Sequence, residues 1–150
     1  MTCCCQLQMN RYIVALVGVT VVFMCLDLAW LSFAGPRFYR PVLGSILLEK
    51  ARIAPAVLFY ILYLAGLMLF AVIPGMESAN WKTSAYLGAA LGLVAYGTYD
   101  LTNQATLAVW SIRLTVMDMA WGSFMSATSA SAGYWAAQWA APAAARRRGF

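Results

Sequence analysis

Three aspartates, Asp27, Asp100 and Asp118, interrupt or end long apolar stretches of the sequence. An acid at the centre of a bilayer costs on the order of 3 kcal/mol, so such residues are candidates for function, including catalysis. Asp27 and Asp118 each open the motif Asp-x-Ala-Trp, which ends at Trp30 and Trp121. On a helix, the tryptophan at i+3 shares the face of the aspartate. Two such acids at one depth could share a proton, one serving as general acid and the other as general base.

Phenol, indole, amide and guanidinium groups accompany these acids in the sequence. Our candidate ligand-binding residues are Trp30, Tyr96, Tyr99, Asn103, Trp121, Arg37 and Arg113. Tyr60 and Tyr63 offer further hydroxyl groups on another predicted helix. Two interpretations stay open for this cluster: a buried network of hydrogen bonds and ion pairs that locks the helices together, or a pocket for a ligand or a reaction.

The composition limits the class of protein that can carry these residues. The chain has 150 residues, of which 63% are hydrophobic and only 10% are charged, and its mean hydropathy is +0.73. So few charges cannot cover the surface of a soluble domain. This excludes a secreted domain, a coiled coil, a disordered chain and a nucleic-acid-binding module. The sequence predicts an all-α, polytopic membrane protein, and we expect membrane lipids rather than nucleic acid as partners of its +5 net charge.

The sequence contains no histidine, which excludes histidine-ligated haem, a Ser-His-Asp triad and HExxH zinc chemistry. The four cysteines are Cys3, Cys4, Cys5 and Cys25, and no two of them form a CxxC pair. We therefore expect no metal site, no cofactor and no disulfide framework. The three adjacent cysteines near the N-terminus are either S-palmitoylated or part of an unmodified tail.

Four apolar segments are long enough to cross a bilayer, which takes about 20 helical residues. The predicted domain covers residues 12–140, with spans at about 12–33, 53–73, 84–102 and 112–139, between a Cys-rich tail (1–11) and a basic tail (141–150). A signal peptide is the alternative for the first segment, but Asp27 would lie inside it and no A-x-A cleavage site follows. Apolar residues at helical spacing in the first loop, including Val42, Leu43 and Ile46, predict a short interfacial helix.

These spans place the aspartates on one side of the membrane. Asp27 lies six residues before Phe33, and Asp118 lies six residues after Ile112, so each is about 9 Å inside the end of its span. In a four-span chain those two ends share a side, and Asp100 ends the third span there. Lys and Arg residues divide five against five between the two sides, so the positive-inside rule gives no orientation.

Small residues predict close helix packing. Gly88 and Gly92 form a GxxxG pattern in the third span, and Gly122 and Ser126 repeat the four-residue spacing in the fourth. These stripes serve either packing within one bundle or the interface of a homodimer or a larger membrane complex. A leucine at Gly92 is expected to destabilise the fold, whereas an alanine there is expected to be mild.

The sequence resembles one family in several motifs. The most specific is Ala95-Tyr-Gly-Thr-Tyr-Asp-Leu-Thr-Asn103, and the others are Asp27-x-x-Trp30-Leu31 with Tyr39, Phe59-Tyr60-x-x-Tyr63 and Asp118-x-x-Trp121-Gly122. With these motifs, from about Tyr12 to Ser131, the chain resembles the bacterial membrane-protein family called domain of unknown function 2177. The resemblance implies a small four-helix, multi-pass protein of the bacterial inner membrane, and it brings no assigned reaction.

Several functions fit these observations, and the sequence leaves open whether the protein is an enzyme. Our first hypothesis is an accessory protein that binds a lipid or a small amphiphile in an acidic and aromatic pocket near one membrane face. The second is an intramembrane lipid-modifying enzyme that uses paired aspartates. A small proton-coupled transporter and a structural subunit of a membrane complex are further alternatives.

Overall fold

The computed structural model describes residues 2–48 and 50–141, and every regular element within them is a helix. The all-α prediction is therefore confirmed. The predicted basic tail lies outside the described residues from position 142 onward, as do the side chains of Cys3, Cys4 and Cys5.

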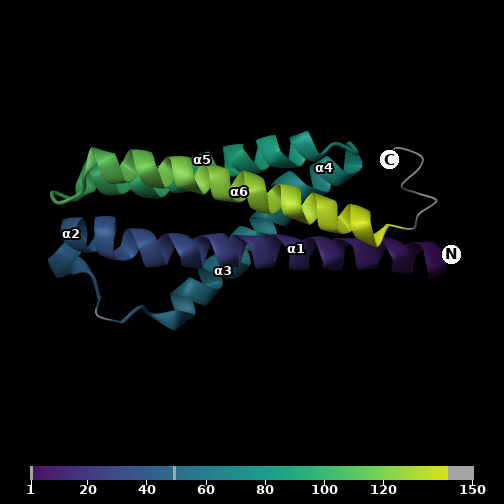
Figure 1. Ribbon diagram of the computed structural model, residues 1–150, viewed down its shortest axis with the longest axis horizontal. Coiled ribbons are helices and arrows are strands. Elements are labelled where there is room, and N and C mark those ends of the chain that lie inside the picture. Colours follow the sequence, from purple (N-terminus) through teal and green to yellow (C-terminus); the bar gives the residue numbers. More distant parts are fainter. Residues whose placement is uncertain (1, 49, 142–150) are drawn as a thin grey trace.

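Four long helical segments form a bundle, as predicted (Figure 1). Helix α1 (Thr2–Ala34) continues through the π-helical turn η1 (Gly35–Tyr39) into the short α2 (Arg40–Leu43) and η2 (Gly44–Ile46). Helix α3 (Ile53–Leu67) continues through a second π-helical turn, η3 (Met68–Val72), into α4 (Ile73–Glu77). The last two helices are α5 (Trp81–Thr106) and α6 (Ile112–Ala140). Helix α1 starts at Thr2, inside the segment expected to be a tail, and α2 with η2 occupies the place of the expected interfacial helix.

Two of the four segments are long and apolar enough to cross a membrane by length and composition: Gln8–Leu43 and Ile53–Glu77. Helices α5 and α6 are similarly long but carry many small and hydroxylated residues. Most of those hydroxyl groups donate to the carbonyl four residues earlier, as Thr98 does to Val94 and Ser129 does to Met125, both at 2.7–2.8 Å. Because the helix itself satisfies these hydroxyl groups, they can lie in an apolar environment at little cost.

Helices α5 and α6 pack closely along their small residues. A Cβ atom on Gly88 would lie 2.7 Å from the carbonyl oxygen of Ser126, and one on Gly92 would overlap the carbonyl oxygen of Gly122. Between them, the Ser123 hydroxyl donates to the Ala89 carbonyl at 3.0 Å. The GxxxG face of α5 thus packs against α6 of the same chain. Even alanine is too large at position 92, contrary to the expectation from sequence.

The main core is built around η3. It joins Val19 and Phe23 of α1 to Leu67, Val72 and Met125 of the other segments. Helix α3 enters this core only with its C-terminal part, because its first residues are turned outward, with Ile53 78% exposed. Figure 1 shows α3 starting away from the other helices and approaching them only near its end.

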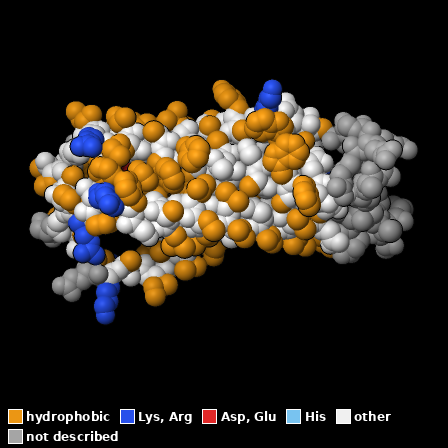
Figure 2. Space-filling view, in the orientation of Figure 1, with side chains coloured by type: hydrophobic (Ala, Val, Ile, Leu, Met, Phe, Trp, Pro, Cys, Tyr) orange, Lys and Arg blue, Asp and Glu red, His pale blue; other side chains and the backbone are white. Residues whose placement is uncertain are grey.

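The surface is apolar over most of its length. On the face in Figure 2, hydrophobic side chains run along the bundle, Lys and Arg side chains gather toward the end that carries α2, and no acidic side chain is visible. At that end a smaller core of Leu43, Trp110 and Leu114 ties α2 to the start of α6. The exposed apolar sides match a lipid environment.

Candidate functional site

Asp118 of α6 is held by two donors from the first helical segment. The Trp30 indole nitrogen donates to its Oδ1 at 3.1 Å, and the Tyr39 hydroxyl donates to its Oδ2. Trp30 comes from α1 and Tyr39 from the π-helical turn that follows it. Asp118 is only 2% exposed, so these bonds replace water around the carboxylate.

The two Asp-x-Ala-Trp motifs meet in space. The Trp30 and Trp121 rings stack with their centroids 4.7 Å apart and their planes 11° apart. The tryptophan of the first motif therefore bonds the aspartate of the second and stacks on its tryptophan. The Trp121 indole nitrogen is buried and has no hydrogen-bond partner among the described residues.

Asp27 accepts a hydrogen bond from a side chain of α3. The Tyr60 hydroxyl donates to its Oδ2 at 2.6 Å, and the carboxylate is 6% exposed. One turn further along α3, the hydroxyl groups of Tyr63 and Ser126 lie 2.8 Å apart, and either could be the donor. Phenol groups of α3 thus join both α1 and α6.

Asp27 and Asp118 line the same cavity, which has a volume of about 490 Å³. The other lining residues come from the first three helical segments: Leu31, Tyr39, Phe59, Tyr60, Tyr63, Ala95, Tyr96 and Tyr99. Three of these residues are also exposed on the outside of the protein, namely Leu31 (46%), Phe59 (43%) and Tyr99 (56%). The cavity therefore reaches the surface beside the outward-leaning start of α3.

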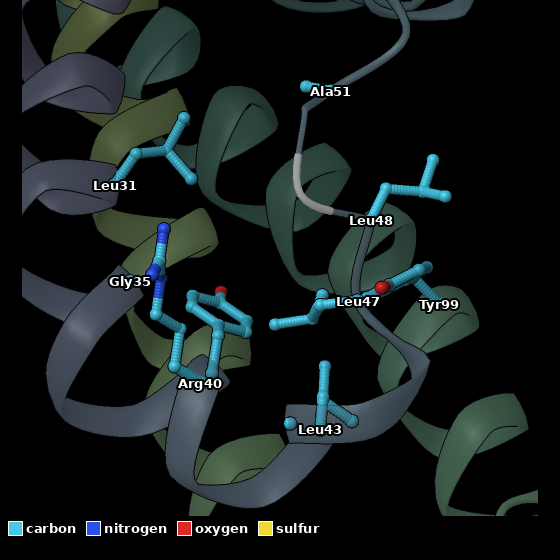
Figure 3. A pocket seen from close by; sticks show the side chains of 10 residues that line it. Leu31, Gly35, Arg40, Leu43, Leu47, Leu48, Ala51 and Tyr99 are labelled. Carbon is cyan, nitrogen blue, oxygen red and sulfur yellow. The ribbon is translucent and has the colours of Figure 1, made fainter.

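A second cavity of about 770 Å³ adjoins the first, because both are lined by Leu31, Tyr39 and Tyr99. Its remaining walls are mostly aliphatic and come from the segment around α2: Gly35, Arg40, Leu43, Gly44, Leu47, Leu48 and Ala51. Figure 3 shows Arg40 on one wall, reaching toward Leu31, with Leu47 and Leu48 across from it. Arg40 is the charged side chain of this second cavity.

The structure separates other candidates from this site. Asp100 is completely buried, does not line either cavity, and neither of its carboxyl oxygens has a hydrogen-bond partner among the described residues. Asn103 does not line these cavities either. The Arg37 and Arg113 guanidinium groups lie over phenylalanine rings, 4.5 Å from the centroid of Phe33 and 5.6 Å from that of Phe38, respectively.

No positive side chain compensates the two cavity aspartates within the described part of the chain, since their bonding partners are phenol and indole groups. The same residues include no group of three or more His, Cys, Asp or Glu side chains that could hold a metal ion. The site is therefore a pair of carboxylates held by neutral donors in an aromatic cavity.

Three tyrosines that hold this site were not among the ligand-binding candidates from sequence: Tyr39, Tyr60 and Tyr63. Of these, Tyr60 and Tyr63 were noted only as further hydroxyl groups on another helix. The i+3 spacing of Tyr60 and Tyr63 was a usable signal, because it puts both hydroxyl groups on one face of a helix. Tyr39 was visible only as part of a family motif. The candidates Trp30, Tyr96, Tyr99 and Trp121 lie in the cavity or against it.

A family described as a predicted membrane protein, DUF2177, matches residues 12–135. The chain belongs to this family. Membership confirms the resemblance seen in the motifs and establishes a membrane protein whose family has no assigned reaction. Both aspartates, both cavities and the α5–α6 contact lie within the residues that DUF2177 matches.

Comparisons with curated proteins and with solved structures find no match.

Proposed function

We propose that this DUF2177 protein binds a lipid or another small amphiphile in the cavity around Asp27 and Asp118. The observation that carries the proposal is the cavity itself, which combines two carboxylates with phenol groups and aromatic walls. Its volume of about 490 Å³ is within the usual range of ligand pockets, about 300–1,000 Å³. A few convergent polar groups on apolar walls are typical of sites for amphipathic ligands.

The adjoining cavities suit the two ends of such a molecule. The first offers carboxylates and hydroxyl groups to a polar head, whereas the second offers aliphatic side chains such as Leu43, Leu47 and Leu48. Since both reach the apolar outer surface, a hydrocarbon tail can extend from them into lipid without crossing water.

Filling the cavity is expected to displace the ligand. Ala95 lines it, so Ala95→Phe places a ring in the space that the ligand would occupy. We expect native mass spectrometry of the purified variant to show at least a ten-fold loss of bound amphiphile, with an unchanged melting temperature. Val94→Phe is the matched control, because Val94 is the preceding residue and is 66% exposed on the outside of α5. Equal ligand occupancy in Ala95→Phe and Val94→Phe would contradict binding in this cavity.

We also propose that α5 and α6 cross the membrane together with the two more apolar segments, as a multi-pass protein of the bacterial inner membrane. At 26 and 29 residues, each is longer than the about 20 residues that a bilayer core requires. Their small and hydroxylated residues face each other or bond within the helix, which lowers the cost of burying them.

A labelling experiment tests this topology. After the native cysteines are replaced by serine, Ser78→Cys reports on the loop before α5 and Ala108→Cys on the loop after it. Ala108 is preferable to Ser111, whose hydroxyl accepts a hydrogen bond from the Leu114 amide at the start of α6. We expect a membrane-impermeant maleimide to reach the two positions from opposite sides of intact membrane vesicles. Labelling of both positions from one side would contradict the four-span arrangement.

An intramembrane lipid-modifying enzyme is the second candidate, favoured by the two acid–phenol pairs, Asp27 with Tyr60 and Asp118 with Tyr39, in one cavity. Such pairs can take up and release protons during a reaction. Comparing the lipids of a deletion strain with its parent separates the candidates. Accumulation of one lipid with loss of another supports the enzyme, whereas an unchanged composition supports binding alone.

A further inference from the structure

We propose that the head of the bound amphiphile is a primary ammonium group carried on a phosphate ester, as in a zwitterionic phospholipid. The ammonium group would lie between Asp27 and Asp118, and the phosphate would lie beside Arg40. This inference rests on the proposed function and specifies its ligand.

The cavity has one carboxylate oxygen that its own donors do not satisfy. The Tyr60 hydroxyl is used on Asp27 Oδ2 and the Tyr39 hydroxyl on Asp118 Oδ2. The Oδ1 atom of Asp27 accepts no hydrogen bond within the described residues. A ligand that brings donors rather than acceptors therefore fits this cavity, and an ammonium group brings three.

The charge balance favours a cation over a neutral hydroxyl donor. Two carboxylates line the cavity and a third, Asp100, is buried next in sequence to the lining residue Tyr99. No Lys or Arg side chain pairs with Asp27, Asp118 or Asp100 in the described part of the chain. Charges are attracted more strongly where little water separates them, so a positive head group gains most from this arrangement.

The proposed phosphate site lies in the cavity that adjoins the carboxylates. Arg40 follows Tyr39 directly in sequence and lines the second cavity, while the Tyr39 hydroxyl bonds Asp118 in the first. A phosphate group suits the guanidinium fork of arginine, which can donate two parallel hydrogen bonds. Acyl chains attached to that phosphate would then contact Leu31, Leu47 and Leu48. The order of ammonium, phosphate and hydrocarbon in a zwitterionic phospholipid matches this order of side chains.

Binding of lipids with identical acyl chains tests the head group. The purified full-length protein in detergent is titrated with phosphatidylethanolamine, phosphatidylcholine and phosphatidylglycerol, and binding is followed by native mass spectrometry. We expect phosphatidylethanolamine to bind at least ten times more tightly than phosphatidylglycerol, which has no cation. Phosphatidylcholine should also bind more weakly than phosphatidylethanolamine, because its trimethylammonium group has no N–H to donate.

Variants then assign the two charges. Asp27→Asn should remove most of the preference for phosphatidylethanolamine over phosphatidylglycerol. Arg40→Gln should weaken the binding of phosphatidylethanolamine at least five-fold. It should leave the binding of dodecylamine unaffected, because dodecylamine has no phosphate. Arg52→Gln is the matched control, because Arg52 is exposed and lines neither cavity.

The outcomes separate this inference from the proposed function. Equal binding of the three lipids would overturn the ammonium head group and leave amphiphile binding in place. Tight dodecylamine binding with no effect of Arg40→Gln on phosphatidylethanolamine would overturn the phosphate site. Failure of all these probes to bind, in a protein that melts normally, would overturn the inference and the proposed function together.

Discussion

Replacing Gly92 by leucine is expected to prevent stable folding of the bundle. A Cβ atom at this position already overlaps the Gly122 carbonyl oxygen of α6 and would lie 2.6 Å from the Ser126 hydroxyl oxygen. Both neighbours belong to a helix that packs against α5 over most of its length, so they cannot move alone. Overpacking by a single methylene costs about 1–3 kcal/mol, and leucine adds several carbon atoms. We expect Gly92→Ala to melt well below the native protein in detergent and Gly92→Leu to yield little folded protein.

Gly66→Ala is the control for this prediction. Gly66 also lies inside a helix, but the nearest atom to its Cβ position is a Leu91 methyl group at 3.8 Å, an ordinary contact. Alanine is the better helix former by about 0.5–1 kcal/mol, so Gly66→Ala should melt at the native temperature or above it. A native melting temperature for Gly92→Leu would show that α5 and α6 do not cross closely at this residue. Because Gly92 faces its own chain, these variants should not be explained by loss of a dimer.

The Asp27→Asn and Asp118→Asn variants are expected to fold normally and to lose most of their ligand binding. At Asp27 the amide oxygen can still accept the Tyr60 hydroxyl, so the helices stay joined while the charge disappears. At Asp118 two donors, Trp30 and Tyr39, meet a group with one acceptor oxygen, so about 1 kcal/mol of stability is lost. Each variant should bind at least ten-fold less amphiphile by native mass spectrometry. The double variant should lose no more amphiphile binding than the single variant that binds least, since both aspartates act on one ligand.

The opposite pattern would identify the two aspartates as scaffolding. In that case both variants would express poorly or melt at markedly lower temperatures, their stability losses would add, and the folded fraction would keep its bound amphiphile. Native residues at functional sites often reduce stability, so normal or raised melting temperatures agree with the proposed function. Circular dichroism melts and mass spectra of the same preparations distinguish the two cases.

Part of the site could be predicted by counting residues along the expected helices. Counting residues from the ends of the spans put Asp27 and Asp118 at one depth on one side, and the structure places both in one cavity. Spacing also indicated that Trp30 and Trp121 share the faces of these acids, although not that the two rings stack. Such counting works because an α-helix has a fixed rise and a fixed turn per residue.

The same arithmetic fails at Tyr39. In an uninterrupted α-helix, nine residues make about two and a half turns, so Tyr39 would point away from the face of Trp30. The chain instead forms a π-helical turn over Gly35–Tyr39, where the Arg40 amide bonds the Gly35 carbonyl. This wider turn takes up an extra residue and lets Trp30 and Tyr39 meet at Asp118. Gly35 and Pro36 mark a break in the α-helical pattern, but they do not specify a π-helical turn, so spacing alone did not assign Tyr39 to the site.

Side-chain contacts between different helices could not be predicted from the sequence either. The bond from Tyr60 to Asp27 depends on how α3 leans against α1, and a helix period says which face is apolar but not where that face goes. Arg37 and Arg113 were expected near the acids because they share a membrane side. They lie over the Phe33 and Phe38 rings instead, as exposed side chains in cation–π contact.

The outward lean of α3 decides how a ligand would arrive. Phe59 and Tyr99 line the first cavity and are also exposed on the flank of the bundle, so in the proposed four-span arrangement the cavity opens toward lipid rather than toward either aqueous compartment. Occupancy then follows the mole fraction of the ligand within the surrounding leaflet and not its concentration in solution. Encounter becomes a two-dimensional diffusion problem, in which the fluidity of the bilayer sets the rate of exchange. Dilution in buffer should leave the bound fraction nearly unchanged, whereas dilution with other lipids should lower it.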